Sequence, residues 1–134
     1  MPYFRDLTPY SFLTAAGHVN SDLLNVGWLS HRHPFGKGIV DARLLERVLR
    51  LSRTPVRLTR GVHRCDICKV FPMFINMDGE SIALGNGEIR VHGINGKVYA
   101  SPTLVCHYID KHGYCPPHEF ADAVGDLERL ASSR

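Results

Sequence analysis

Two cysteines and a histidine stand within six positions of this chain, in the segment RGVHRCDICKVF (residues 60–71). Cys65 and Cys68 are separated by two residues, and His63 precedes them. This spacing is typical of a redox couple, half of a zinc site, or two inert core thiols. A thioredoxin-like couple begins a long helix, whereas the residues after Cys68, KVFPMFINMDG, have a strand pattern. The spacing therefore favours a zinc knuckle that takes further ligands from another segment.

The further ligands are predicted in HYIDKH (residues 107–112), whose two histidines are separated by four residues. Zinc sites commonly use such a histidine pair beside a cysteine pair. On a helix that turns by about 100° per residue, His112 falls in the middle of the apolar face and His107 on its flank, whereas Cys106 points to solvent. We therefore expect one zinc ion bound by Cys65, Cys68, His107 and His112.

Other ligand sets remain open at this point. His63 is the alternative ligand, because residues two apart in an extended segment project to the same side. Cys115, just past the helix, is a weaker alternative. An inward histidine is also commonly a hydrogen-bonded core residue, and paired cysteines are also found as core thiols. Four protein ligands would close the zinc shell, which predicts a structural site rather than a catalytic one.

Two further groups of polar residues could bind a ligand. Glu88, Arg90 and His92 alternate in GEIRVHG, so they share one face of a predicted strand and could line a polar pocket. The same alternation is typical of the solvent-facing side of a sheet. A set of basic residues near the knuckle could bind phosphate, although a solvated basic face is the interpretation that we favour; this set comprises Arg53, Arg57, Arg60, Arg64 and Lys69.

The segments around these residues predict an α+β fold. The run LLNVGWL (residues 23–29) and residues 56–60 read as strands, and a helix is expected between Asp41, which can cap it, and Pro55, which stops it. Residues 71–100 have a period of two, with turns at Asp78-Gly79 and Asn95-Gly96. This pattern predicts an antiparallel meander of three or four strands with an Asn95-Gly96 hairpin, packed by helices.

Two helices are predicted to close the chain. Ser101 is expected to cap the first of them, with Pro102 at its first position, and Gly113 is expected to end it. Pro116-Pro117 precedes the second, whose expected buried positions are Phe120, Val124, Leu127 and Leu130.

Length and composition are those of one domain. The chain has 134 residues, 44% of them hydrophobic, with a formal net charge of +3. We therefore expect residues 1–134 to form a single zinc-stabilised domain. Arg5 and Asp6 interrupt the apolar run that a secretory signal needs, and no stretch reaches the length of a membrane span. These features predict a cytoplasmic protein without a membrane partner, whose cysteines are thiols or metal ligands.

Two resemblances bear on function. The segment HRCDICK is similar to the opening knuckle of HNH-type endonucleases, but the catalytic Asp-His strand and the second CxxC of that family are not found downstream. Most of the chain, from Tyr3 to about Val124, resembles an uncharacterised family of small bacterial proteins. The resemblance is carried by YFRDLTPY, NVGWL, RGVHRCDIC, LGNGEIRV and VYASPTLVCHYIDKHGYCPPHEF. It implies one bacterial domain with a shared HxCxxC…HYxxxH core and supplies no activity.

These observations favour a zinc-binding protein with a structural metal site that acts by binding another protein, for example as an immunity or accessory protein of a bacterial toxin or defence system. Two alternatives stay open. One is a metal-dependent hydrolase or HNH-like nuclease that uses His63 and Glu88 at an open site. The other is a basic nucleic-acid-binding module.

Overall fold

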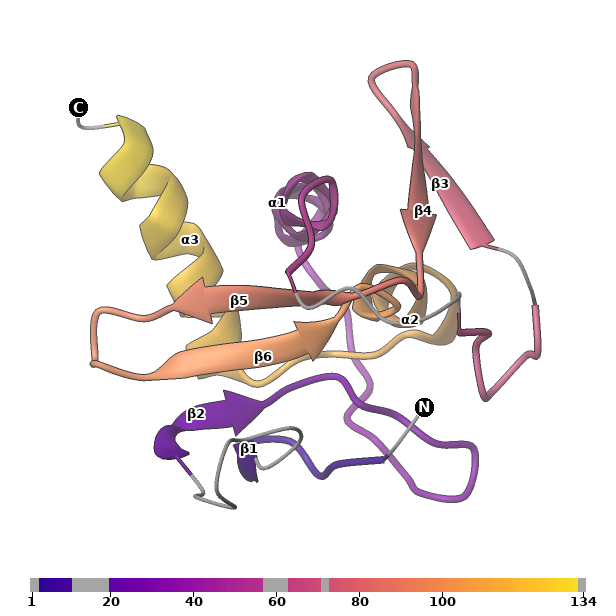
Figure 1. The fold of residues 1–134 in the computed structure, drawn as a ribbon, viewed down its shortest axis with the longest axis horizontal. Helices are drawn as coiled ribbons and strands as arrows, with labels where there is room; N and C mark the ends of the chain where they lie inside the picture. Colours follow the sequence, from indigo (N-terminus) through magenta and orange to yellow (C-terminus); the bar gives the residue numbers. More distant parts are fainter. Residues whose placement is uncertain (1–2, 11–19, 57–62, 71–72, 133–134) are drawn as a thin grey trace.

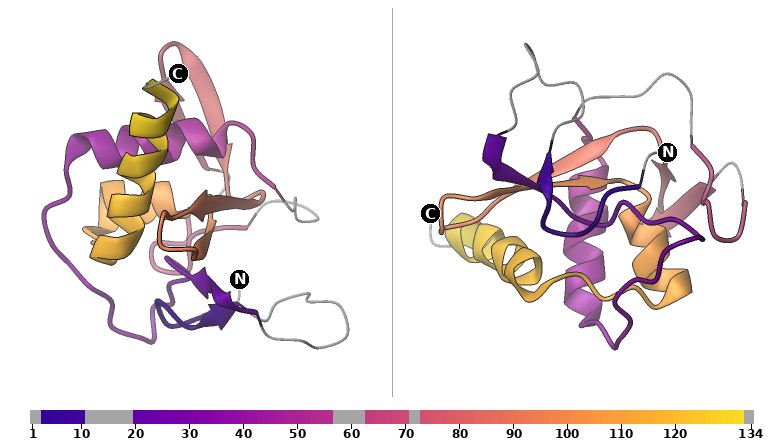
Figure 2. Two further views of the ribbon diagram at one scale, coloured as in Figure 1. Left: turned by 90° about the vertical axis from the view of Figure 1, so that its left-hand side faces the viewer. Right: turned by 90° about the horizontal axis from the view of Figure 1, so that it is seen from below.

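The computed structural model describes residues 3–10, 20–56, 63–70 and 73–132. These residues form a four-stranded sheet, a two-stranded sheet and three helices, so the α+β class is confirmed. Figure 1 shows the arrangement, and Figure 2 shows the helices on one side of the larger sheet. The elements in chain order are β1 (Pro9–Tyr10), β2 (Asn20–Asn25), α1 (Ala42–Ser52), β3 (Met73–Met77), β4 (Glu80–Leu84), β5 (Glu88–His92), β6 (Val98–Pro102), α2 (Val105–His112) and α3 (His118–Ser132).

The larger sheet differs from the predicted meander. Its strand order is β1-β2-β6-β5, and β2 pairs with β6 in parallel, so the sheet is mixed. The β3–β4 hairpin forms a sheet of its own. The separation follows from Gly85, whose φ of 87° turns the chain and whose missing side chain leaves room for the carbonyl of His63. The predicted period of two is correct, but it carries no information on which strands become neighbours.

Both predicted hairpins are present. Asp78 and Gly79 have φ values of 51° and 79°, as a two-residue hairpin turn requires, and they join β3 to β4. In the β5–β6 hairpin, the N–H of Gly93 donates to the carbonyl of Lys97 (2.8 Å). The first connection is the predicted two-residue turn, whereas the second spans residues 93–97 around Asn95-Gly96.

The helices agree with the sequence in most of their boundaries. Asp41 caps α1 by accepting a hydrogen bond from the N–H of Arg43 (2.8 Å), and Gly113 ends α2 with a φ of 68°. Ser101, the predicted N-cap of α2, is instead a residue of β6 that pairs with Ile89. The helix begins only at Val105, without a side-chain cap, because the sheet ladder holds Ser101 and Pro102 in β6 and a turn at residues 103–104 follows.

The remaining boundaries differ in smaller ways. The predicted strand over residues 23–29 is displaced toward the N-terminus in β2, and its last four residues are buried without belonging to a strand. Phe120 and Val124 are buried in α3 as predicted. The side chains of Leu127 and Leu130 and the backbone of residues 57–60 lie outside the described residues. None of the described helices combines the length and apolar character that a membrane crossing needs.

The core that positions the site lies between the larger sheet and the helices. Val48 of α1, Val91 of β5 and Leu104 before α2 are fully buried in it. The first part of α2 is enclosed, since residues 104–109 are all buried, and only Asp110 and Lys111 of the helix are exposed. This enclosure fixes the position of α2, the element that supplies two of the predicted metal ligands.

Candidate metal centre

The cysteine pair lies on a tight turn that the backbone organises around Cys65. The N–H of Lys69 donates to the carbonyl of Cys65 (2.9 Å), and Lys69 has a φ of 63°, which reverses the chain. The N–H groups of Ile67 and Cys68 point at the sulfur of Cys65, at 3.4 and 3.5 Å. This arrangement suits a thiolate, since N–H donors stabilise negative charge on sulfur.

The structure brings the four predicted ligands together. The Sγ of Cys65 lies 3.4 Å from Nε2 of His112, and the Sγ of Cys68 lies 3.3 Å from Nε2 of His107. The two Nε2 atoms are 3.1 Å apart. All four ligand atoms lie within 4.8 Å of one another, so the cluster could hold a metal ion.

Three of the six separations among the four ligand atoms are close to those of a tetrahedral zinc site. With zinc–sulfur and zinc–nitrogen bonds of about 2.3 and 2.05 Å, tetrahedral geometry places sulfur and nitrogen about 3.6 Å apart and two nitrogens about 3.3 Å apart. The observed separations of 3.4, 3.3 and 3.1 Å are close to these values. Two thiolates with two imidazoles are also a donor set that zinc favours.

The two histidines meet although they are about 140° apart around an ideal helix. Their rings are nearly perpendicular, with centroids 4.8 Å apart and an interplanar angle of 79°. His112 is the last residue of α2 and is followed by the left-handed Gly113. The length of the imidazole and the position of His112 at the helix end let both Nε2 atoms reach one point.

Burial divides the cluster into an inner and an outer pair. Cys65 and His107 are buried, whereas His112 is half-buried and Cys68 is exposed. Burial raises the pKa of Cys65 and lowers the pKa of His107 and His112. The sequence prediction placed His112 at the middle of the buried face and His107 at its flank; the structure shows the reverse order of burial.

Cys106 was predicted to point to solvent, and this prediction is wrong. Its side chain is fully buried against α1, with its sulfur 3.4 Å from the hydroxyl of Ser52. Burial raises the pKa of the Cys106 thiol to about 12, so it is protonated at neutral pH. The physical reason is that α2 contacts both α1 and the knuckle, so more than one face of the helix is buried. The helical period of the sequence identifies only the most apolar face.

The alternative ligands lie outside the cluster of described residues that could hold a metal. His63 is half-buried, and its N–H donates to the carbonyl of Gly85 (2.8 Å), which ties the knuckle to the end of β4. Burial lowers the pKa of His63. Cys115 is held near Gly36, whose carbonyl accepts from its N–H (2.9 Å).

The predicted polar pocket on β5 is filled. Glu88 is only 3% exposed and accepts hydrogen bonds from the hydroxyl of Tyr10 (3.0 Å) and the guanidinium of Arg90 (3.1 Å). The Arg90 guanidinium also lies 4.8 Å from the centre of the Tyr10 ring, and His92 is exposed. Alternation along β5 could not show that β1 supplies a tyrosine that covers this face.

The predicted basic surface is largely neutralised where the structure describes it. Arg53 forms ion pairs with Asp78 (3.8 Å) and Glu80 (3.2 Å), and Lys69 pairs with Asp66 (3.0 Å). Arg64 is exposed, and Arg57 and Arg60 lie outside the described residues.

Two features of the site were not predicted. The carboxylate of Asp66, within the knuckle, accepts hydrogen bonds from the backbone N–H of His31 (2.9 Å) and contacts its Nδ1 (2.6 Å), which joins the knuckle to the loop after β2. These hydrogen bonds hold the pKa of Asp66 well below its usual range. Apart from the acidic residue between the two cysteines, no sequence pattern predicts this pairing.

The second feature is an apolar cleft of about 420 Å³ beside the cluster. It is lined by three of the predicted ligands and by apolar and charged side chains: Cys68, His107, His112, Val70, Met73, Phe74, Ile75, Asp110 and Lys111. Phe74 is 58% exposed and Val70 is 49% exposed. The sequence signal for this cleft is Phe74, a large apolar residue at an outward position of the predicted hairpin.

Comparisons with known proteins identify the family of this chain but assign no activity to it. The chain matches no curated protein and no solved structure. Residues 2–125 match the model of a domain of unknown function, DUF7919. Because this match covers most of the chain, the chain belongs to the DUF7919 family.

Proposed function

We propose that this protein is a zinc-stabilised binding domain, in which one zinc ion held by Cys65, Cys68, His107 and His112 supports a surface for another protein. The observation that carries the proposal is the convergence of four ligand atoms from two distant segments within 4.8 Å. Two sulfurs and two imidazole nitrogens are a donor set that tetrahedral zinc sites use.

A structural role follows from the number of ligands. Four protein ligands fill the shell of structural zinc and leave no position for a catalytic water. The ion would join the knuckle, residues 63–70, to α2. Zinc binding in small zinc-dependent domains contributes about 10–16 kcal/mol, which is comparable to the whole stability of an ordinary domain, about 5–15 kcal/mol.

The apolar cleft supports a protein as the partner. Phe74 and Val70 are exposed beside the metal ligands, and exposed apolar clefts are typical of interaction sites. Two of the basic residues predicted to bind phosphate, Arg53 and Lys69, are paired with carboxylates, which favours a protein over a nucleic acid at this surface. The narrower role as an immunity or accessory protein of a toxin or defence system stays a prediction, as does the cytoplasmic location.

Elemental analysis tests the metal part of the proposal. Protein purified without added metal should contain about one zinc per chain, because the ligands form one site. Cys65→Ser should lose the zinc, whereas Cys115→Ser, which changes a cysteine outside the cluster, should retain it. Absence of any transition metal from protein never exposed to a chelator would contradict the proposal.

The partner part needs a separate experiment. A tagged chain should retain a protein partner in its native host, and Phe74→Asp should abolish the retention because it places a charge in the apolar cleft. Ile94→Asp is the matched control, since Ile94 is also an exposed apolar residue but lies in the β5–β6 turn. Equal retention by wild type and both variants would exclude the cleft as the binding surface.

A further inference from the structure

A second cavity, of about 380 Å³, lies between the N-terminal segment and the loop after Leu29. It shares no lining residue with the cleft beside the metal centre. Its volume falls within the range of small-molecule sites. We call it the N-terminal pocket, and the residues that matter for its chemistry are Tyr3, Arg5, Asp6, Leu29, His33 and Phe35.

Aromatic rings form the walls of this pocket. The rings of Tyr3 and His33 stack in parallel, with 3.8 Å between their centroids and an interplanar angle of 8°. Phe35 is held edge-on against the buried Tyr114, with centroids 6.1 Å apart. Rings fixed in this way offer a preformed apolar surface for a flat or branched side chain.

The carboxylate of Asp6 is held in place by groups behind it. Oδ1 accepts from the N–H of Gly27 (3.0 Å), and Oδ2 accepts from the hydroxyl of Tyr114 (2.7 Å). The next residue, Leu7, has a φ of 66°, and its N–H donates to the carbonyl of Asn25 (2.7 Å). Each carboxylate oxygen keeps a second lone pair. Within the described parts of the chain, no cation forms an ion pair with Asp6.

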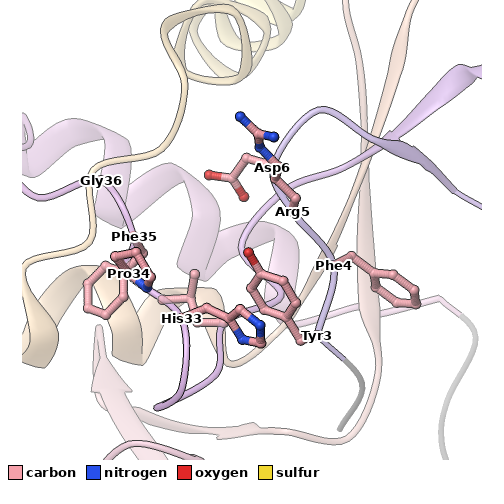
Figure 3. Close-up of a pocket in the computed structure, with 9 residues that line it drawn as sticks. Tyr3, Phe4, Arg5, Asp6, His33, Pro34, Phe35 and Gly36 are labelled. Atoms are coloured by element: carbon pink, nitrogen blue, oxygen red, sulfur yellow. The ribbon is translucent and has the colours of Figure 1, made fainter.

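The guanidinium of Arg5 supplies the opposite charge. Figure 3 shows it above the stacked rings of Tyr3 and His33, on the same side of them as the Asp6 carboxylate. Among the residues that the structure describes, no carboxylate is paired with it. The pocket therefore offers the N–H donors of the Arg5 guanidinium and the oxygen acceptors of the Asp6 carboxylate next to an apolar surface.

We propose that the N-terminal pocket binds a free amino acid with an apolar side chain, in its zwitterionic form. The carboxylate of the ligand pairs with Arg5, whose fork matches it with two hydrogen bonds, and the ammonium pairs with Asp6. The side chain packs against Tyr3 and Phe35. A simple anion would meet the charge of Asp6 and a simple cation that of Arg5, so a ligand with both charges matches the pocket best.

Isothermal titration calorimetry with phenylalanine as the probe tests this proposal. Two analogues carry the same ring and one charge each: 3-phenylpropionate lacks the ammonium, and phenethylamine lacks the carboxylate. We expect saturable binding of phenylalanine and at least about 10-fold weaker binding of both analogues, as the loss of a charge-assisted hydrogen bond predicts. Absence of saturable phenylalanine binding, or equal binding of either analogue, overturns the proposal.

Variants locate the site. Arg5→Gln should weaken phenylalanine binding by about 10-fold or more and leave phenethylamine binding unchanged. Arg43→Gln is the matched control, because Arg43 is an exposed arginine of α1 outside the pocket. An equal effect of the two substitutions overturns the assignment. The pocket contains none of the proposed zinc ligands, so either result leaves the metal centre to be judged on its own.

Discussion

At the scale of single residues, the two cysteines of the knuckle differ in their surroundings but should matter equally for the metal. Cys65 is buried and receives two N–H groups, whereas Cys68 is exposed. Replacing either with serine removes one of four ligands. We expect Cys68→Ser to lower zinc content and reduce the free energy of unfolding by several kcal/mol, because metal binding is coupled to folding. Denaturant titration beside elemental analysis checks this, and full zinc content in Cys68→Ser would contradict it.

Cys106 makes a contrasting prediction. Its side chain is packed against α1, so Cys106→Ser places a more polar hydroxyl in the core and should cost about 1–3 kcal/mol. Zinc content should stay at the wild-type level, because Cys106 is outside the cluster. Denaturant titration with elemental analysis separates the two effects. An unchanged free energy of unfolding would show that the thiol is not enclosed.

The burial of Cys106 could not be predicted from the sequence, whereas the metal ligands could. Helical spacing identified α2 and its two histidines, and CxxC spacing identified the knuckle, because both depend on local geometry. The burial of Cys106 depends on Ser52 of α1, more than fifty residues earlier in the chain. The burial of Glu88 likewise depends on Tyr10, a residue of the opposite edge strand. Contacts of this range leave no periodic mark in the sequence.

At the scale of elements, Tyr10 joins β1 to β5 through its hydroxyl, which donates to the buried Glu88. Tyr10→Phe removes this donor to a charged group and should lower the free energy of unfolding by about 1.5–3 kcal/mol. Arg90 still pairs with Glu88, so the fold should persist. Denaturant titration measures the change; a difference of less than about 0.5 kcal/mol, typical of surface substitutions, would contradict this role of the Tyr10 hydroxyl.

A substitution at Gly85 tests the contact between the knuckle and the end of β4. An added Cβ would collide with the carbonyl oxygen of His63, two residues before Cys65. Gly85→Ala should therefore destabilise the fold and weaken zinc binding. Gly79→Ala is the matched control: Gly79 also has a positive φ, but an added Cβ would meet nothing within 4 Å. Gly85→Ala should cost about 1–3 kcal/mol more than Gly79→Ala, the range for overpacking. Equal costs in thermal or denaturant melts would contradict the contact.

Hairpins and helix ends were predictable because their signals are local. Asp78-Gly79, Asn95-Gly96 and Gly113 occupy the turns and the helix end that they predicted. The parallel pairing of β2 with β6 joins segments more than seventy residues apart, and the separate β3–β4 sheet depends on a turn at Gly85. Neither the partner of a strand nor its direction follows from an alternating pattern.

At the scale of the whole molecule, the proposed zinc ion is a cross-link between a turn and an enclosed helix. Removing it with a chelator should lower the melting temperature and release α2 from the knuckle. Adding zinc back should restore the melting curve. The control is the same chelator already saturated with zinc, which should have no effect. An unchanged melting temperature in protein shown by elemental analysis to be metal-free would argue against a structural role.

Zinc X-ray absorption on protein purified without added metal tests the four-ligand metal site most directly. We expect a shell of two sulfurs at about 2.3 Å and two nitrogens at about 2.0–2.1 Å, from Cys65, Cys68, His107 and His112. His63→Ala should leave that shell unchanged, since His63 lies outside the cluster. Fewer than two sulfurs in the wild-type shell, or the replacement of a nitrogen by a water oxygen in His63→Ala, would contradict this ligand set.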